Sequence, residues 1–386
     1  MTDIAGLLEG DAGATDARVA RAEVRHLALA TGLPSFTLPD GRRTPSDLPV
    51  LLVRVTDEDG VQGHSLLWVQ RDRQAPLLEA GLRYLADLVE QRSLKDAPGL
   101  LGSMRQATAF LGAGGVAAFG VSGLQMAIED LLCRRRGASL SEVLGRRRDH
   151  VRVYQTGLML HSRVEELLVE AAAMYDRGLR AMKMMVGKPD IEEDVARLEA
   201  VKQSLPGDVS LMVDALQRWT LPDALRASER FAHLGLAWIE DPIAQDDLDG
   251  YRELARSSPV PVATGETCFS MRELRALLEA GIPYIVGELE RLGGMGAWVH
   301  AAEIVHGAGA TMLPHLYPHV SAQILATVPQ HEVWLEYVPW FDALADQEFH
   351  LDDGRLPISS APGSGFTPSA DAVERLARGP WQRLTG

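Results

Sequence analysis

The sequence has very little cysteine. Its 386 residues include only two cysteines, Cys133 and Cys268, which lie far apart and lack the spacing typical of a metal site. This scarcity argues against a cysteine-ligated metal and favours free thiols in a reducing cytoplasm.

Basic residues are also scarce relative to acidic ones. The chain has 38 Lys and Arg against 53 Asp and Glu, which gives a net charge of −15. That balance argues against nucleic acid or an anionic membrane as a partner. It does not exclude a small anionic substrate, because a bound divalent cation reverses the local sign of charge.

The sequence shows no pattern typical of a targeting signal or a membrane-spanning segment. The first 13 residues are acidic and lack a basic region followed by an apolar run, so no signal peptide is predicted. We also expect no apolar segment long enough to cross a bilayer. A composition of 46% apolar and 24% charged residues is typical of a soluble globular protein, and the length suits two domains or one barrel with an appendage.

Three acidic residues stand at equal intervals in the middle of the chain. Asp214, Glu240 and Glu266 each follow a short apolar run, and both gaps are 26 residues (240 − 214 and 266 − 240). That interval fits one strand, one helix and two loops, so it predicts a repeated β/α unit. In a (β/α)8 barrel the carboxyl ends of all strands converge on one face, where the three acids would meet.

Three neighbouring carboxylates need a shared proton or a cation, because like charges at close range disfavour ionisation. Oxygen-only ligands in an open site favour Mg2+, with Mn2+ as a substitute. Any one of these acids could equally be a solvated loop residue, and it is their equal spacing that favours a metal site.

The first part of the chain has an α+β pattern. Loose alternation predicts a strand over residues 19–29, and the runs 50–56 and 61–68 flank a turn sequence typical of a hairpin. We expect residues 1–17 to be a mobile leader and residues 31–49 to be a long loop.

Helical periodicity follows the hairpin. It covers residues 76–91, 103–111 and 116–135, and Gly137 follows the last of these as a stop signal. Strands, a hairpin and then helices indicate a module distinct from the rest of the chain.

After residue 149 strand and helix patterns alternate. Eight candidate strands occur, at residues 151–155, 180–185, 209–213, 236–239, 260–263, 284–286, 311–313 and 332–335. They predict a modified TIM barrel of the (β/α)7β type, with a short or missing last helix. The expected organisation is a leader (1–17), an α+β domain (18–148), the barrel (149–345) and a C-terminal segment (346–386) that packs back on the first domain.

Other strand ends offer further chemical groups. Lys183 lies on the second strand, and Glu288, His315 and Glu336 lie at the ends of the last three. A metal-bound carboxylate has a more acidic α-proton, which His315 could remove while Glu288 holds its ring and Lys183 stabilises the enediolate. Each residue alone also has a structural interpretation, since Lys183 could reach out of the barrel rim, Glu336 could cap a loop and His315 could be a buried structural residue.

These residues carry a resemblance to the enolase superfamily and, within it, to the mandelate racemase subgroup. The motifs that carry it are His64-Ser65, Val213-Asp214, Ile239-Glu240-Asp241-Pro242, Gly265-Glu266, Glu288 before Leu292-Gly293-Gly294, His315-Leu316-Tyr317 and Trp334-Leu335-Glu336. The matching region runs from about residue 18 to residue 345.

The resemblance implies a role for each residue. Asp214, Glu240 and Glu266 would be the Mg2+ ligands, His315 the acid/base on one face of the substrate, and Glu336 a protonated hydrogen-bond donor to the substrate carboxylate. The α+β module would be a capping domain whose loops, around residues 31–48 and 64–68, choose the substrate, with His64 among the substrate-binding residues. Relatives assemble as dimers to octamers, so a homo-oligomer is expected.

Three positions depart from the family pattern. Met185 replaces the second lysine of Lys-x-Lys, Glu288 replaces the aspartate that supports the histidine, and Leu216 replaces a frequent substrate-binding asparagine. A two-base proton transfer needs a proton carrier on both faces of the substrate, so Met185 disfavours racemisation. Met185 and Leu216 would make the substrate pocket more apolar.

The sequence therefore predicts a Mg2+-dependent hydro-lyase that acts on a sugar acid or another hydroxy acid. Two alternatives remain open at this stage. One is a racemase or epimerase with an unidentified second base, and the other is a catalytically impaired relative retained as a binding protein.

Overall fold

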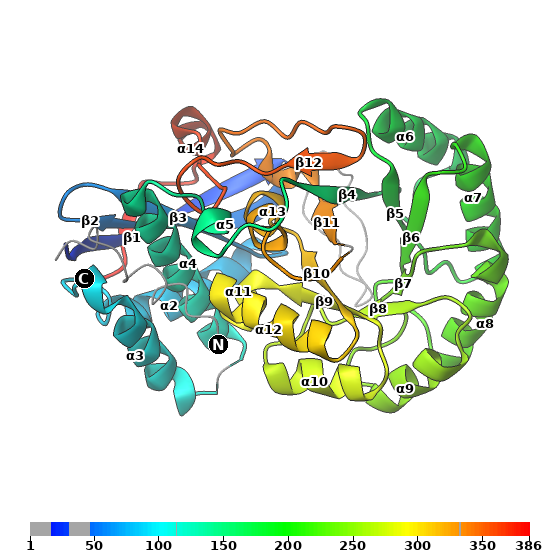
Figure 1. The fold of residues 1–386 in the computed structure, drawn as a ribbon, viewed down its shortest axis with the longest axis horizontal. Coiled ribbons are helices and arrows are strands. Elements are labelled where there is room, and N and C mark those ends of the chain that lie inside the picture. Colours follow the sequence, from blue (N-terminus) through cyan, green and yellow to red (C-terminus); the bar gives the residue numbers. More distant parts are fainter. Residues whose placement is uncertain (1–16, 31–46, 113, 332) are drawn as a thin grey trace.

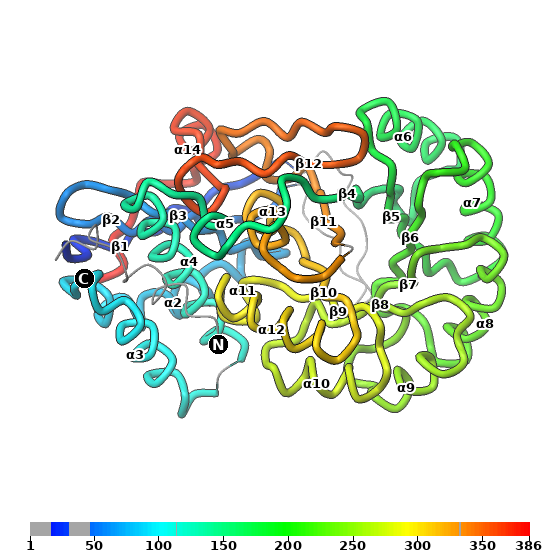
Figure 2. Tube along the Cα trace, viewed as in Figure 1, coloured from blue at the N-terminus to red at the C-terminus, as the bar shows by residue number. Residues whose placement is uncertain are grey.

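The computed structural model describes residues 17–30, 47–112, 114–331 and 333–386, which form two packed sheet systems (Figures 1 and 2). The leader predicted for residues 1–17 and the loop predicted for residues 31–49 lie almost wholly outside these ranges. Within the described part, residues 47–49 begin a strand rather than continue the loop.

The N-terminal sheet is antiparallel and has four strands. They are β1 (Val19–Ala30), β2 (Asp47–Asp57), β3 (Gln62–Trp68) and β13 (Gln382–Arg383). Their order is β13-β1-β2-β3, so the last strand of the chain pairs with the first. The predicted hairpin is confirmed: β2 and β3 pair in register, and Gly60 takes the turn with a φ of 84°.

Three helices cover this sheet: α2 (Ala75–Ala86), α3 (Ala97–Ala109) and α4 (Val116–Arg136). Helix α2 ends five residues earlier than predicted, and α3 starts six residues earlier than predicted. Each helix has a proline in its first turn, Pro76 and Pro98, where the missing N–H costs nothing. Helix α4 ends as predicted at Gly137, which has a left-handed φ of 67°.

Helix α4 corrects one expectation. By length and composition alone it could span a membrane, contrary to the prediction that no segment is long enough. It is instead the central helix of the N-terminal module, with 78% of its most apolar window buried. Both cysteines are buried and unpaired, as predicted.

The second sheet is a parallel barrel. Its strands are β4 (His150–Gly157), β5 (Ala181–Met185), β6 (Ser210–Asp214), β7 (Ile239–Glu240), β8 (Val262–Thr264), β9 (Tyr284–Glu288), β10 (Thr311–His315) and β11 (Trp334–Tyr337). All eight predicted strands are present, with ends shifted by up to three residues; Glu332, predicted to begin the last strand, lies outside the described residues.

Helices alternate with these strands and form the outer layer (Figure 1). They are α6 (Val164–Asp176), α7 (Ile191–Ser204), α8 (Leu221–Phe231), α9 (Leu248–Ser257), α10 (Met271–Glu279), α11 (Leu289–Leu292), α12 (Met295–Gly307) and α13 (Pro318–Leu325). Strands pair in the order β10-β9-β8-β7-β6-β5-β4-β11, which makes a nearly closed barrel. Among the described residues only the short 3-10 helix η4 (Pro339–Phe341), and no α-helix, follows β11 directly, so the predicted (β/α)7β arrangement is confirmed.

The chain links the two sheets at both ends of the barrel. Short helix α5 (Leu140–Val143) precedes β4, and β12 (Arg355–Pro357) pairs antiparallel with β4. Helix α14 (Ala370–Leu376) then leads to β13 beside β1. The boundaries of the four predicted parts remain a prediction.

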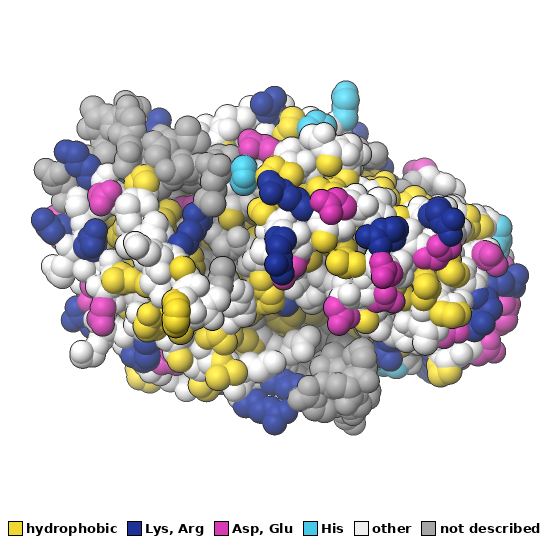
Figure 3. Space-filling model, turned by 90° about the horizontal axis from the view of Figure 1, so that it is seen from below, with side chains coloured by type: hydrophobic (Ala, Val, Ile, Leu, Met, Phe, Trp, Pro, Cys, Tyr) yellow, Lys and Arg dark blue, Asp and Glu magenta, His cyan; other side chains and the backbone are white. Residues whose placement is uncertain are grey.

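A layer of large side chains fills the barrel below its open end. It includes Tyr154, Met212, Trp238 and Trp334, and the indole of Trp238 contacts Tyr154 edge to face at 5.4 Å. Because this layer fills the barrel interior, the polar side chains lie at the carboxyl ends of the strands. Outside, the face in Figure 3 carries interspersed acidic and basic side chains among scattered apolar ones.

Candidate active site

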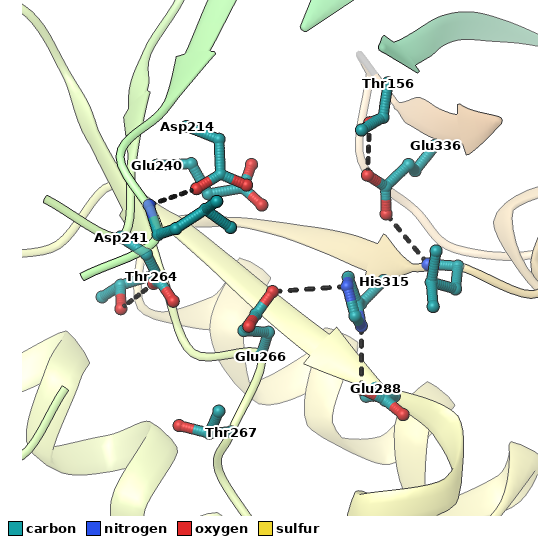
Figure 4. A network of polar contacts seen from close by, with 12 residues as sticks. Thr156, Asp214, Glu240, Asp241, Thr264, Glu266, Thr267, Glu288, His315 and Glu336 are labelled. Atoms are coloured by element: carbon teal, nitrogen blue, oxygen red, sulfur yellow. Dashed lines mark hydrogen bonds and ion pairs between the residues drawn. The ribbon is translucent and has the colours of Figure 1, made fainter. Parts of the chain in front are cut away.

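The carboxyl ends of the barrel strands bring the predicted polar residues together, and Figure 4 labels all of them except Lys183. They are Lys183 (β5), Asp214 (β6), Glu240 (β7), Glu266 after β8, Glu288 (β9), His315 (β10) and Glu336 (β11). The register of the strands makes some of these residues neighbours: Asp214 pairs with Glu240, and Glu288 pairs with His315.

Lys183 is the buried cation of the group. Its Nζ lies 2.6 Å from Glu240 Oε1, 3.0 Å from Glu336 Oε1 and 3.4 Å from Asp214 Oδ2. Burial lowers the pKa of Lys183, but the surrounding carboxylates raise it well above its ordinary value. Lys183 is therefore a fixed ammonium group.

The acids around Lys183 carry more negative charge than it neutralises. Burial and repulsion from Glu240 and Glu266 raise the pKa of Asp214 to about 7, although the charge of Lys183 acts to lower it. Burial likewise raises the pKa of Glu240, whose Oε2 accepts a hydrogen bond from Trp238 at 3.1 Å. Hard oxygen ligands that repel one another in a buried site suit a divalent cation such as Mg2+.

The three predicted ligands have not converged into a metal site. Among the described residues no three acidic, histidine or cysteine side chains are already arranged around one point. Glu266 points instead toward His315, with Oε2 at 3.3 Å from Nε2 (Figure 4). The assignment of Asp214, Glu240 and Glu266 to a metal thus remains a prediction.

His315 and Glu288 form a hydrogen-bonded pair. Nδ1 of His315 lies 2.8 Å from Glu288 Oε2, which leaves Nε2 facing the cleft. Burial lowers the pKa of His315, but the charges of Glu266 and Glu288 raise it to about 10. The extra methylene of Glu288, compared with the aspartate of the family pattern, does not prevent the contact.

Sequence reasoning missed two residues that hold Glu288. Trp68 Nε1 donates to Glu288 Oε1 at 3.1 Å, and Arg291 Nε donates to Oε2 at 3.0 Å. Arg291 could have been found, because it follows Glu288 by three residues at the start of a helix, the spacing of an ion pair. Trp68 comes from the N-terminal sheet, so no local spacing indicates it.

Glu336 corrects an expected protonation state. Its Oε1 accepts from Thr156 Oγ1 at 2.5 Å, and its Oε2 accepts from the Leu316 N–H at 2.9 Å. Burial raises the pKa of Glu336, but Lys183, His315 and these hydrogen bonds lower it to about 2. The structure thus favours the carboxylate form of Glu336 over the predicted protonated donor, because Lys183, His315 and the two hydrogen bonds outweigh burial and the nearby carboxylate of Glu240.

A cleft of about 470 Å3 opens above these groups. Met185 and Leu216 line it, as predicted for substrate-binding residues, but His64 does not. His64 instead lines a separate small cavity with His319, although it lies on the same strand as Trp68, four positions earlier, where alternation gives both side chains the same face of the sheet. The expected role of His64 at the substrate is therefore wrong for the described structure.

Comparisons with known proteins agree with this architecture. Residues 166–372 match the family model described as Enolase C-terminal domain-like. The chain is 30% identical to L-talarate/galactarate dehydratase of Salmonella typhimurium, over 93% of the chain and 89% of that protein. It is 28% identical to 3,6-anhydro-alpha-L-galactonate cycloisomerase of Streptomyces coelicolor, over 86% of the chain and 92% of that protein.

One solved structure is similar to this chain over almost its whole length. L-talarate dehydratase from Polaromonas sp. JS666, complexed with Mg and L-glucarate, superposes with a TM-score of 0.85 and 29% sequence identity. The match covers 96% of this chain and 99% of that one.

Proposed function

The chain belongs to the enolase C-terminal domain-like family, as its motifs predicted, and from that premise we propose that it is a Mg2+-dependent dehydratase of a hydroxy acid. The observation that carries the proposal is the pair of His315 and Glu288 at the cleft, with a methionine where the family pattern has a second base. Nε2 of His315 faces the cleft with Glu288 behind the ring, whereas Met185 holds a thioether at the position of a second base.

The acidic ligands would hold the metal. We assign Asp214, Glu240 and Glu266 to Mg2+, which when bound supplies a Lewis acid for the substrate carboxylate. Lys183, fixed by Glu240 and Glu336, provides a second positive charge beside that carboxylate as the negative charge on it grows. Glu336 holds Lys183 and Thr156 in place as an ionised group.

His315 moves the proton. The charge of Glu266 is the largest cause of the raised pKa of His315, so a cation held by Glu266 would lower that pKa and favour a neutral imidazole. The neutral Nε2 takes the proton from the carbon next to the carboxylate, and the imidazolium then gives that proton to the β-hydroxyl as the C–O bond breaks. Water leaves, the electrons of the C–H bond form a C=C bond, and the resulting enol becomes a 2-keto acid. One histidine suffices when both groups leave from the same face.

The relatives support the class of reaction. The Salmonella and Polaromonas proteins are dehydratases of acid sugars by name, so a sugar acid or a related hydroxy acid is the substrate class we assign. We further propose a cytoplasmic homo-oligomer, between a dimer and an octamer, with no nucleic-acid or membrane partner.

A matched pair of variants tests the assignment. His315→Asn should lower 2-keto acid formation by about 10²–10⁴-fold while Mg2+ binding, followed by calorimetry, persists. His306→Asn makes the same change at an exposed position on α12 and should retain full turnover. Full activity of His315→Asn would overturn the role of His315, and α-deuterium exchange from D2O without keto acid would instead favour a racemase or epimerase.

A further inference from the structure

The cleft wall beyond the catalytic groups is largely apolar. The side chains that matter most here are Trp68, Phe119, Met185, Leu216, Phe269 and Trp340. They come from both sheet systems: β3 and α4 on one side, and the strand ends and loops of the barrel on the other. A substrate in this cleft therefore meets hydrocarbon and aromatic surface as soon as it extends past the strand ends.

Two of these residues lie beside the reacting groups. Met185 follows Lys183 by two positions on β5, and Leu216 follows Asp214 by two. Leu216 has a left-handed φ of 51°, and its N–H donates to Asp214 Oδ1 at 2.8 Å, so its backbone is tied to a candidate metal ligand. Neither side chain can donate or accept a strong hydrogen bond from a substrate hydroxyl.

Aromatic pairs form the outer wall. Trp68 and Trp340 have ring centroids 6.3 Å apart, and the ring of Trp68 is also 6.3 Å from His315. Phe119 and Phe269 meet edge to face at 5.7 Å. These contacts fix flat apolar surfaces next to the imidazole, as in sites that bind hydrophobic ligand parts.

The cations of the described cleft lining are already paired. Lys183 contacts three carboxylates, Arg291 contacts Glu288, and His315 contacts Glu288 and Glu266. A second carboxylate at the far end of a diacid would find no unpaired cation among these described lining residues. Asp47 also lines the cleft, and its negative charge would repel a second carboxylate.

Hydrogen-bonding capacity for a polyol chain is limited in the described lining. Thr267 Oγ1 already donates to Gln245. Gln74 Oε1 is buried and without a hydrogen-bond partner, which suits one hydroxyl group rather than several. Each further hydroxyl placed against Met185, Leu216 or the aromatic rings would lose its water without a replacement partner.

We propose that the substrate is a 2,3-dihydroxy monocarboxylic acid whose chain beyond C3 is apolar, aromatic or branched aliphatic, and that this apolar part packs on the wall of Met185, Leu216 and the four aromatic residues. The proposal rests on the dehydratase function above. With 2,3-dihydroxy-3-phenylpropanoate, loss of the α-hydrogen and the 3-hydroxyl as water gives 2-oxo-3-phenylpropanoate through its enol.

The test compares acids that differ beyond C3. Both diastereomers of 2,3-dihydroxy-3-phenylpropanoate and of 2,3-dihydroxy-4-methylpentanoate are set against galactarate and arabinonate, with Mg2+ present. Binding is measured by calorimetry and turnover by 2-keto acid formation. We expect the apolar acids to bind at least about 10-fold more tightly than galactarate and to have kcat/KM higher by a similar factor.

Substitutions of Leu216 test whether this residue of the apolar wall causes the preference for apolar acids. Leu216→Asn should lower kcat/KM for the apolar acids by about 10-fold or more and lower it less for arabinonate, because a polar amide replaces apolar contact. Leu216→Met keeps the apolar surface and should keep the order of preference. An unchanged preference in Leu216→Asn would show that Leu216 does not select the substrate.

The possible outcomes test the substrate class and the dehydratase function separately. Faster dehydration of galactarate or arabinonate than of the apolar acids overturns the substrate class and leaves the dehydratase function standing. Tighter binding of the apolar acids without keto acid from any acid overturns the dehydratase function and leaves the substrate class standing.

Discussion

The indole Nε1–H of Trp68 donates a hydrogen bond to Glu288 Oε1 at 3.1 Å, so the N-terminal sheet holds the carboxylate that orients the histidine of the barrel. The other oxygen of Glu288 contacts His315 at 2.8 Å and Arg291 at 3.0 Å. Burial raises the pKa of Glu288, but Arg291 and His315 hold it well below its ordinary value. The two sheet systems therefore complete one site together.

Trp68→Phe should weaken the reaction without unfolding the protein. The ring keeps its apolar contact, but Glu288 loses one donor, so the imidazole is held less firmly and kcat should fall by about 10-fold. A loss confined to kcat, with KM for the acid little changed, would indicate positioning.

The matched control for Trp68→Phe is Trp381→Phe. Trp381 is not among the residues that line the cleft, and Arg54 covers its ring at 3.8 Å, a contact that phenylalanine can retain. Turnover of this control should equal that of the parent protein. Equal losses in both variants would point to a general effect of removing an indole rather than to the contact with Glu288.

Met185→Lys should change the outcome of proton abstraction. A second ammonium beside Lys183 has its pKa lowered by the like charge, which makes it a proton carrier on the face that now lacks one. We expect α-deuterium incorporation from D2O into recovered substrate, together with slower keto acid formation. Met185→Leu removes the sulfur without adding a base and should show no new exchange; exchange in Met185→Leu would contradict the explanation.

The barrel and most of its polar residues could be predicted because they follow local rules. The interval of 26 residues between Asp214, Glu240 and Glu266 sets the β/α repeat even though β7 is only two residues long. Once that repeat is known, side chains at the strand ends must share one face.

What could not be predicted depends on contacts between distant segments. Trp68 reaches Glu288 across 220 positions of sequence, and no periodicity encodes that contact. The ionised state of Glu336 depends on the joint charge of Lys183 and His315, which no motif records. His64 was assigned by a motif, but the groups that pack around its end of β3, His319 and Phe366 among them, place it in another cavity.

Gly120→Ala should destabilise the N-terminal module. A Cβ at Gly120 on α4 would lie 2.7 Å from the carbonyl carbon and oxygen of Gly81 on α2, so the two helices would have to move apart. Overpacking of this kind costs about 1–3 kcal/mol in the free energy of unfolding, measurable by urea denaturation.

Gly102→Ala is the control for that substitution. Gly102 is exposed on α3, and a Cβ there meets nothing within 4 Å. Because alanine has a lower entropy cost in a helix, this variant should gain about 0.5–1 kcal/mol. A stable Gly120→Ala variant would mean that the approach of α2 to α4 is not tight in solution.

The protein should lose stability in acid through His319. Its ring is buried between Phe349 and Phe366, at centroid distances of 5.9 and 6.2 Å, and its Nε2 has no hydrogen-bond partner. Burial lowers the pKa of His319 to about 4, whereas an unfolded histidine has a pKa of about 6.5. The unfolded chain therefore takes up a proton at higher pH than the folded one.

The stabilising contribution is complete above pH 6.5 and is lost progressively as the pH falls toward 4, to a total of about 3 kcal/mol. His319→Gln removes the titrating group, so its unfolding free energy should depend less steeply on pH between about 6.5 and 4 than that of the parent protein. His306→Gln makes the same change at an exposed position and should leave the slope unaltered. Identical slopes in His319→Gln and the parent protein would show that His319 is not the group whose protonation opens the fold.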